Sequence, residues 1–128
     1  MLRAMNYRHA YHAGNHADVL KHIVLLALVD ALKRKETPFF VLDTHAGRGR
    51  YLLGGAESRK TSEADGGVFK LMGAARLPEP AERYLRAVVA NNPVGALITY
   101  PGSPLLIAQA LRSHDRLAAC ELQPDEAQ

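Results

Sequence analysis

The sequence predicts an α/β domain built on a parallel β-sheet, and three observations favour this class. The short apolar run at residues 39–42 ends in Asp43 and is followed at once by a turn that contains Gly47 and Gly49. A helix-like segment precedes this run, and a second apolar run, residues 117–120, ends in Glu121. Such runs between helical segments are typical of buried parallel strands, and ligands bind at the carboxyl ends of these strands.

The composition is that of one soluble globular domain. The 128 residues are 48% hydrophobic and 23% charged, and no apolar run approaches the ~20 residues of a membrane span. The amino terminus lacks the apolar core of a secretory signal, and the single Cys120 excludes an internal disulfide framework. We therefore expect a cytoplasmic protein, and the net charge of +3 mildly favours an anionic partner such as nucleic acid.

Residues 6–14 have neither helical nor strand periodicity, but they are rich in aromatic and basic side chains. Tyr7 and Tyr11 could stack on bases, while Arg3 and Arg8 could meet phosphates. The alternative is an arm that packs on the surface of the domain.

A helix is predicted at residues 16–35, with Asn15 as its N-cap. Its apolar stripe is expected to pack on the sheet and consists of Val19, Leu20, Ile23, Leu26 and Ala27, with Asp30 or Ala31. Asp18, Lys21 and His22 fall off this stripe or at its edge, so they would line a site or form a solvated face. A zinc site among the nearby histidines is disfavoured, because no cysteine or carboxylate except Asp18 has ligand spacing.

Residues 52–95 are predicted to form a small helical subdomain inserted into a main domain of residues 1–51 and 96–128. The insertion is expected to contribute little to a shared core and to contact something outside the domain. The main domain is expected to resume with a strand at residues 96–100. A helix that Ser103 caps and Pro104 begins follows, and then the strand at residues 117–121.

Two strands that end in Asp43 and Glu121, with a glycine turn after the first, suggest a crevice for a nucleoside. The turn does not continue as G-x-G-x-x-G, which disfavours a dinucleotide with a pyrophosphate and hence an NAD(P)-dependent enzyme. A nucleoside without pyrophosphate, such as S-adenosylmethionine, fits better. If only the two glycines are considered, the alternative is an ordinary strand followed by a turn.

Four motifs carry a closer resemblance: YRHAYHAGNHADVLKH at residues 7–22, LDTHAGRGRY at 42–51, YPGSP at 100–104 and ELQP at 121–124. In this order they resemble the RlmJ family, which are bacterial 23S ribosomal RNA (adenine-N6) methyltransferases that use S-adenosylmethionine. The resemblance implies the amino-terminal part of a class I methyltransferase (Rossmann-like) sheet with a small inserted helical subdomain.

The resemblance also implies roles for individual residues. The family's positions that contact S-adenosylmethionine correspond here to His22, His45, Ser103 and Glu121, and Glu121 would bind the ribose. The family's cofactor loop includes Asp43, Gly47 and Gly49. Tyr7 matches a position placed against the target adenine of the RNA, and Lys21 lies in the same motif. Transfer to N6 needs an adenine that has left its stack and a methyl group in line with the nitrogen.

One departure from the family is large, because its catalytic Asp-Pro-Pro-Tyr motif is absent from this sequence. We therefore expect this chain to be the amino-terminal part of a longer enzyme or a truncated product. It should contain no catalytic residue and should not transfer methyl groups alone. The full-length enzyme is expected to be monomeric and to need no metal. The competing hypothesis is a non-enzymatic nucleic-acid-binding module related to DNA uptake or utilisation.

Overall fold

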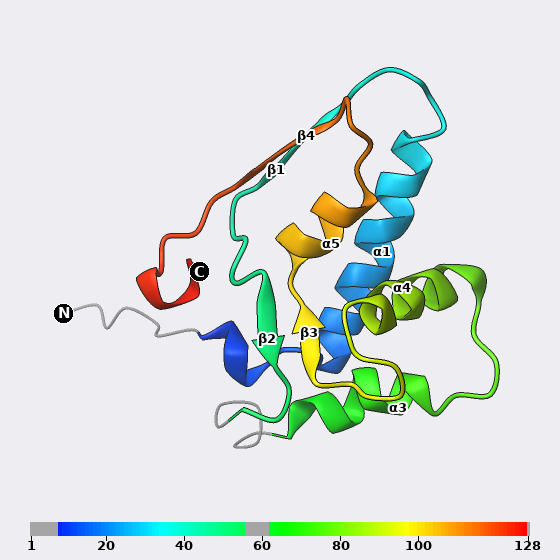
Figure 1. The fold of residues 1–128 in the computed structure, drawn as a ribbon, viewed down its shortest axis with the longest axis vertical. Helices are drawn as coiled ribbons and strands as arrows, with labels where there is room; N and C mark the ends of the chain where they lie inside the picture. Colours follow the sequence, from blue (N-terminus) through cyan, green and yellow to red (C-terminus); the bar gives the residue numbers. More distant parts are fainter. Residues whose placement is uncertain (1–7, 56–61, 128) are drawn as a thin grey trace.

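The computed structural model describes residues 8–55 and 62–127, which form a mixed α/β fold with two small sheets (Figure 1). The helices are α1 (His16–Leu32), α3 (Val68–Met72), α4 (Glu79–Ala90) and α5 (Ser103–Ala110). The strands are β1 (Phe40–Asp43), β2 (Arg50–Leu52), β3 (Thr99–Pro101) and β4 (Arg116–Ala119). Short 3₁₀ turns lie at η1 (His9–Tyr11), η2 (Glu63–Gly66) and η3 (Pro124–Glu126).

The first sheet pairs β1 with β4 in parallel, and Asp43 lies opposite Ala119 at its carboxyl end. The predicted parallel pairing is therefore confirmed. The prediction that β1 is buried is wrong, since Phe40 and Leu42 are 63% and 55% exposed. Alternate residues of a strand share one face, and none of the described elements covers the face to which these two side chains point.

The second sheet was not predicted. In it β2 pairs antiparallel with β3, so that Tyr51 lies opposite Tyr100. The strand expected at residues 96–100 lies at residues 99–101 and belongs to this ribbon rather than to the β1–β4 sheet. Both tyrosines are almost completely buried. The ribbon depends on the pairing of two segments that are distant in the sequence, and local composition does not show such a pairing.

Helix α1 begins as predicted, because the side chain of Asn15 accepts a hydrogen bond from the Asp18 amide at 2.8 Å. The helix ends at Leu32, three residues before the expected end. Its buried residues are Asp18, Val19, His22, Leu26 and Val29, whereas Leu20 is 66% exposed. The apolar stripe was thus only partly right, because the buried face of α1 also carries two polar side chains that have partners elsewhere in the fold.

The inserted region shares the core of the molecule. One cluster of buried residues joins Tyr51, Tyr100 and Leu106 to Val68, Tyr84 and Val88. Helix α4 packs against α1, and the backbone amide of Val68 donates to the Gly14 carbonyl at 2.8 Å. The expectation that residues 52–95 contribute little to a shared core is therefore wrong, because α4 packs against α1 and Val68 belongs to the same buried cluster. The proposed domain boundaries themselves stay a prediction.

Candidate functional site

A cavity of about 550 Å³ lies at the carboxyl ends of β1 and β4. Its lining includes six residues that the sequence analysis placed in a site, namely Lys21, His22, His45, Gly47, Ser103 and Glu121. They come from α1, from the turn after β1, from the start of α5 and from the segment after β4. The cavity is of the size in which proteins hold small ligands.

Glu121 ties the two strand ends together. Its Oε2 accepts a hydrogen bond from the Gly47 amide at 2.8 Å, and its Oε1 accepts one from the Gln123 amide at 2.8 Å. Beside it, the Ala46 amide donates to the Cys120 carbonyl at 2.9 Å. The predicted proximity of Glu121 and the glycine turn is confirmed. These backbone bonds, that of Gln123 first, lower the pKa of Glu121, so the side chain is a carboxylate near neutral pH.

Gly47 is required by the geometry of the turn. Its φ is +64°, in the left-handed region that favours glycine, and a Cβ at this position would collide with the Tyr51 hydroxyl. That hydroxyl accepts a hydrogen bond from the Arg48 amide at 2.9 Å, which fixes the turn against β2. The absence of a side chain at Gly47 therefore lets the loop pack on Tyr51 and still border the cavity.

Asp43 does not line the cavity but bonds to Ser103, which does. Its Oδ2 accepts a hydrogen bond from Ser103 Oγ at 2.5 Å. Ser103 was predicted to cap α5, but Gly102 is the N-cap and Ser103 is the first helical residue. The hydroxyl bonds to Asp43 instead of to the helix amides, so this contact connects the end of β1 to the start of α5.

His22 is 1% exposed, and its Nδ1 lies 2.6 Å from the hydroxyl of Tyr100. Burial lowers the pKa of His22 to about 4, although the nearby Asp18 acts in the opposite direction, so the imidazole is neutral at neutral pH. Its Nε2 is buried and has no hydrogen-bond partner among the residues that the structure describes. A buried nitrogen of this kind, in a residue that borders a cavity, is suited to a bound ligand.

Asp18 organises the polar end of α1. The side chain is 2% exposed, and its Oδ2 lies 2.7 Å from His9 Nε2 and accepts from the Gly14 amide at 3.0 Å. Its Oδ1 lies 3.2 Å from Lys21 Nζ. Burial alone would raise the pKa of Asp18, but the His9 hydrogen bond and the neighbouring positive charges lower it to about 2. The carboxylate thereby holds His9 and Lys21, which both line the cavity.

Sequence reasoning did not assign three further lining residues, His9, Tyr51 and Glu126, to the cavity. Glu126 is 3% exposed and pairs with Arg48, whose Nε lies 3.3 Å from its Oε2. Burial raises the pKa of Glu126. Glu126 lies beyond the last predicted element, so no pattern in the sequence indicated its position, whereas His9 and Tyr51 stood inside motifs already noted.

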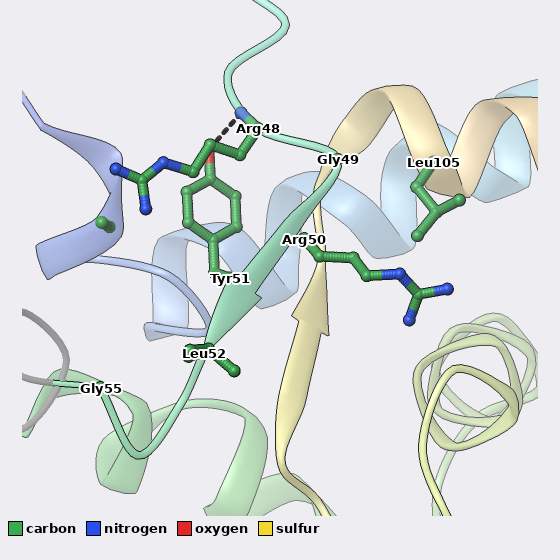
Figure 2. Close-up of a pocket in the computed structure, with 8 residues that line it drawn as sticks. Arg48, Gly49, Arg50, Tyr51, Leu52, Gly55 and Leu105 are labelled. Carbon is green, nitrogen blue, oxygen red and sulfur yellow. Dashed lines mark hydrogen bonds between the residues drawn. The ribbon is translucent and has the colours of Figure 1, made fainter. Parts of the chain in front are cut away.

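Gly49 and Tyr7 are not part of the cavity as described. Gly49 lines a second cavity of about 450 Å³, which shares Tyr51 with the first and is also lined by Arg48, Arg50 and Leu105. Figure 2 shows the side chains of Arg48, in the turn before β2, and of Arg50, at the start of β2, extending in opposite directions, with Arg50 below Leu105. Arg50 is exposed, and its guanidinium donates to the Asn91 carbonyl at 3.2 Å. Tyr7 lies outside the described residues.

Among residues 8–55 and 62–127, no group of three or more His, Cys, Asp or Glu side chains is placed to hold a metal ion. In that same part of the chain, no helix combines the length and the apolar character needed to cross a membrane. The free thiol of Cys120 is exposed.

Comparison with known proteins gives concordant results. Residues 36–128 match the family described as ribosomal RNA large subunit methyltransferase D, RlmJ. Two curated proteins named ribosomal RNA large subunit methyltransferase J are similar, one from Haemophilus influenzae (49% identity over 123 residues) and one from Escherichia coli (45% over 122). In each case the alignment covers 95% of this chain and 44% of the relative.

A solved structure is similar as well. The crystal structure of a Legionella pneumophila protein described as DUF519 superposes with a TM-score of 0.81 at 40% identity. The match covers 90% of this chain and 42% of that one. The chain thus spans less than half the length of the relatives that it matches.

Proposed function

The chain belongs to the RlmJ family of ribosomal RNA large subunit methyltransferases, and from this premise we propose that it forms the cofactor-binding part of an S-adenosylmethionine-dependent enzyme. The proposed reaction is methylation of N6 of an adenine in 23S ribosomal RNA, on a class I (Rossmann-like) methyltransferase fold. The observation that carries this proposal is the cavity, in which residues from four separate motifs meet at the ends of β1 and β4.

The residues at the cavity fit the chemistry of S-adenosylmethionine. Glu121 is a carboxylate at the tip of a strand, where it can accept hydrogen bonds from ribose hydroxyls, and Gly47 keeps the adjacent backbone free of a side chain. His22 presents a buried nitrogen without a partner among the described residues. His45 and Ser103 complete the proposed set, with Asp43 holding the Ser103 hydroxyl. Bound there, the cofactor would supply an activated methyl group.

Lys21 is the residue that we assign to the RNA side of the site. Its side chain is 57% exposed, it borders the cavity, and Asp18 fixes its ammonium group. A cation in this position can attract a phosphate or polar edge of a flipped-out nucleotide. The role of Tyr7 against the adenine stays a prediction. The proposed substrate implies a cytoplasmic enzyme, and a monomeric state of the full-length enzyme remains an expectation.

We propose that this chain binds the cofactor but does not transfer methyl groups on its own. The family's Asp-Pro-Pro-Tyr motif, which supplies the acceptor for the exocyclic amine, is absent from its 128 residues. Cofactor binding is therefore the activity on which the proposal is tested.

The test is titration calorimetry of the chain with S-adenosylhomocysteine, the product form of the cofactor. Glu121→Gln keeps the shape of the side chain and one oxygen that can accept a hydrogen bond from a backbone amide, but it removes the negative charge. It should weaken binding by about tenfold or more, because a hydrogen bond to a charged group contributes about 1.5–3 kcal/mol. Glu79→Gln, at an exposed site on α4, is the matched control and should bind as the parent does.

The competing function gives a different result in the same experiment. A nucleic-acid-binding module would bind RNA and show no heat with S-adenosylhomocysteine. Equal affinity of the parent and Glu121→Gln for S-adenosylhomocysteine would contradict the proposed role of Glu121.

A further inference from the structure

Three buried side chains form a hydrogen-bonded row that ends at the cavity. Tyr84 Oη lies 2.9 Å from Tyr100 Oη, which in turn lies 2.6 Å from His22 Nδ1. Each of the three residues is at most 1% exposed. Tyr84 belongs to α4 in the inserted region, Tyr100 to β3 and His22 to α1, so the row joins three separate elements of the fold.

All three groups are neutral near neutral pH. Burial lowers the pKa of His22 to about 4, and burial raises the pKa of Tyr84 and Tyr100 above their usual range. The row therefore carries three hydrogens, one on each hydroxyl and one on the imidazole. Two hydrogen bonds use two of them, so one hydrogen has no acceptor within the row. It lies at one of the two ends, or on Tyr100 if that oxygen accepts from both neighbours.

The two possible directions of the row have different consequences. If His22 donates from Nδ1 and Tyr100 donates to Tyr84, the hydrogen of Tyr84 is left in the apolar core. Within the described residues, Tyr100 is the sole hydrogen-bond partner of that hydroxyl. This direction leaves two buried groups unpaired, the Tyr84 hydrogen and the lone pair of His22 Nε2, and an arrangement in which Tyr100 accepts from both neighbours also leaves two. The other direction leaves only the Nε2 hydrogen unpaired, and one fewer unpaired buried group should favour it by about tenfold.

In the other direction, Tyr84 donates to Tyr100, Tyr100 donates to His22 Nδ1, and the remaining hydrogen sits on Nε2. Both tyrosine hydroxyls are then satisfied. The nitrogen that remains without a partner belongs to the residue that borders the cavity.

We propose that Tyr100 is a positioning residue that holds His22 as its Nε2–H tautomer, so that the cavity receives a hydrogen-bond donor from α1 rather than an acceptor. Tyr84 donates to the Tyr100 oxygen, which satisfies its own hydroxyl, whereas the Tyr100 hydroxyl has Nδ1 as its acceptor. Because this deepens the proposed function, the ligand atom that meets Nε2–H would be an acceptor, such as a carboxylate or hydroxyl oxygen of the cofactor.

The tautomer can be read without any ligand. In a long-range ¹H–¹⁵N spectrum of the labelled chain at pH 7, the His22 signals, identified by their loss in His22→Gln, should show a protonated Nε2 and an unprotonated Nδ1. A protonated Nδ1, or an imidazolium, would overturn the proposal.

Two phenylalanine variants separate the tyrosines. Tyr100→Phe removes the donor to Nδ1 and should give a mixture of tautomers, whereas Tyr84→Phe removes the other hydroxyl of the same row and should leave Nε2 protonated. Unchanged His22 signals in a folded Tyr100→Phe protein would contradict the proposal, as would loss of the Nε2–H form in Tyr84→Phe.

S-adenosylhomocysteine binding connects the tautomer to the site. Tyr100→Phe should bind about fivefold more weakly, the equivalent of about one neutral hydrogen bond. A parent chain with the expected tautomer but no S-adenosylhomocysteine binding would refute the proposed function and leave the tautomer intact. The reversed tautomer in a chain that binds would refute this inference alone.

Discussion

Replacing Asp18 by asparagine removes a buried negative charge while keeping most of the shape of the side chain. Asp18 holds His9, Lys21 and the Gly14 amide at the amino end of α1. Asparagine retains an oxygen that can accept from Gly14, so the variant tests the charge rather than the presence of a polar group. The expected effect is a loss of folding free energy that depends on pH.

The magnitude follows from the pKa of Asp18, which falls from an ordinary 3.8 to about 2 in the folded chain. A difference of this size corresponds to about 2 kcal/mol of stability. Because the folded pKa is the lower of the two, this stability is fully present above about pH 5. It is lost as the pH falls through about 2, below which the carboxyl group is protonated in both states.

Urea denaturation followed by far-ultraviolet circular dichroism at several pH values between 7 and 2 measures this. Asp18→Asn should be less stable than the parent by about 2 kcal/mol at pH 7, and the difference should shrink toward zero in acid. Asp30→Asn is the control on the same helix, since Asp30 forms a part-exposed pair with Arg83 at 3.1 Å and should change stability by less than about 1 kcal/mol. A constant difference across the pH range would refute the reasoning.

Three further outcomes are expected. Gly47→Ala should destabilise the chain by about 1–2 kcal/mol in urea denaturation, because its φ is +64°. Gly54→Ala, where a Cβ meets nothing within 4 Å, should cost much less, and equal losses would contradict the role of the turn. Leu26→Ala should cost about 2–5 kcal/mol and Leu20→Ala less than about 0.5 kcal/mol, since their side chains are 5% and 66% exposed; the reverse order would refute the assigned helix face. Lys21→Gln, at the residue assigned to the RNA side of the site, should weaken RNA binding uniformly across sequences and reduce the slope of its salt dependence by about one, as measured by fluorescence anisotropy, and an unchanged slope would exclude a phosphate contact.

Local signals in the sequence predicted the parts of the fold that local chemistry determines. Asn15 was recognised as a cap because its side chain can satisfy a free helix amide three residues on. The adjacency of Glu121 and the turn at Gly47 was predictable because carboxyl ends of parallel strands lie at one edge of a sheet. The other predicted residues that line the cavity, among them His22, His45 and Ser103, were proposed from the family resemblance and not from local patterns.

The features that were missed depend on contacts between distant segments. The β2–β3 ribbon pairs Tyr51 with Tyr100, a register that no short pattern reveals. Periodicity placed Leu20 in the core and Asp18 at its edge, because an apolar stripe does not register that a carboxylate can be buried when His9 and Gly14 satisfy it.

The apolar runs were also read too simply. Phe40 and Leu42 suggested a strand buried on both faces, but the described part of the fold covers only one face of β1. A run of large hydrophobic residues indicates what a strand can bury, whereas the burial itself depends on the elements that pack on it.

The interleaved core has a consequence for protein engineering. Val68, Tyr84 and Val88 fill the same interior as Tyr51 and Tyr100, and α4 supplies one hydroxyl of the row that reaches the cavity. A minimal biosensor for adenosyl ligands could therefore not be obtained by splicing β2 directly to β3. Such a deletion would expose the side of α1 that faces the core and would remove the Tyr84 end of the row. Any smaller version must therefore keep α3 and α4 or replace the volume that they fill.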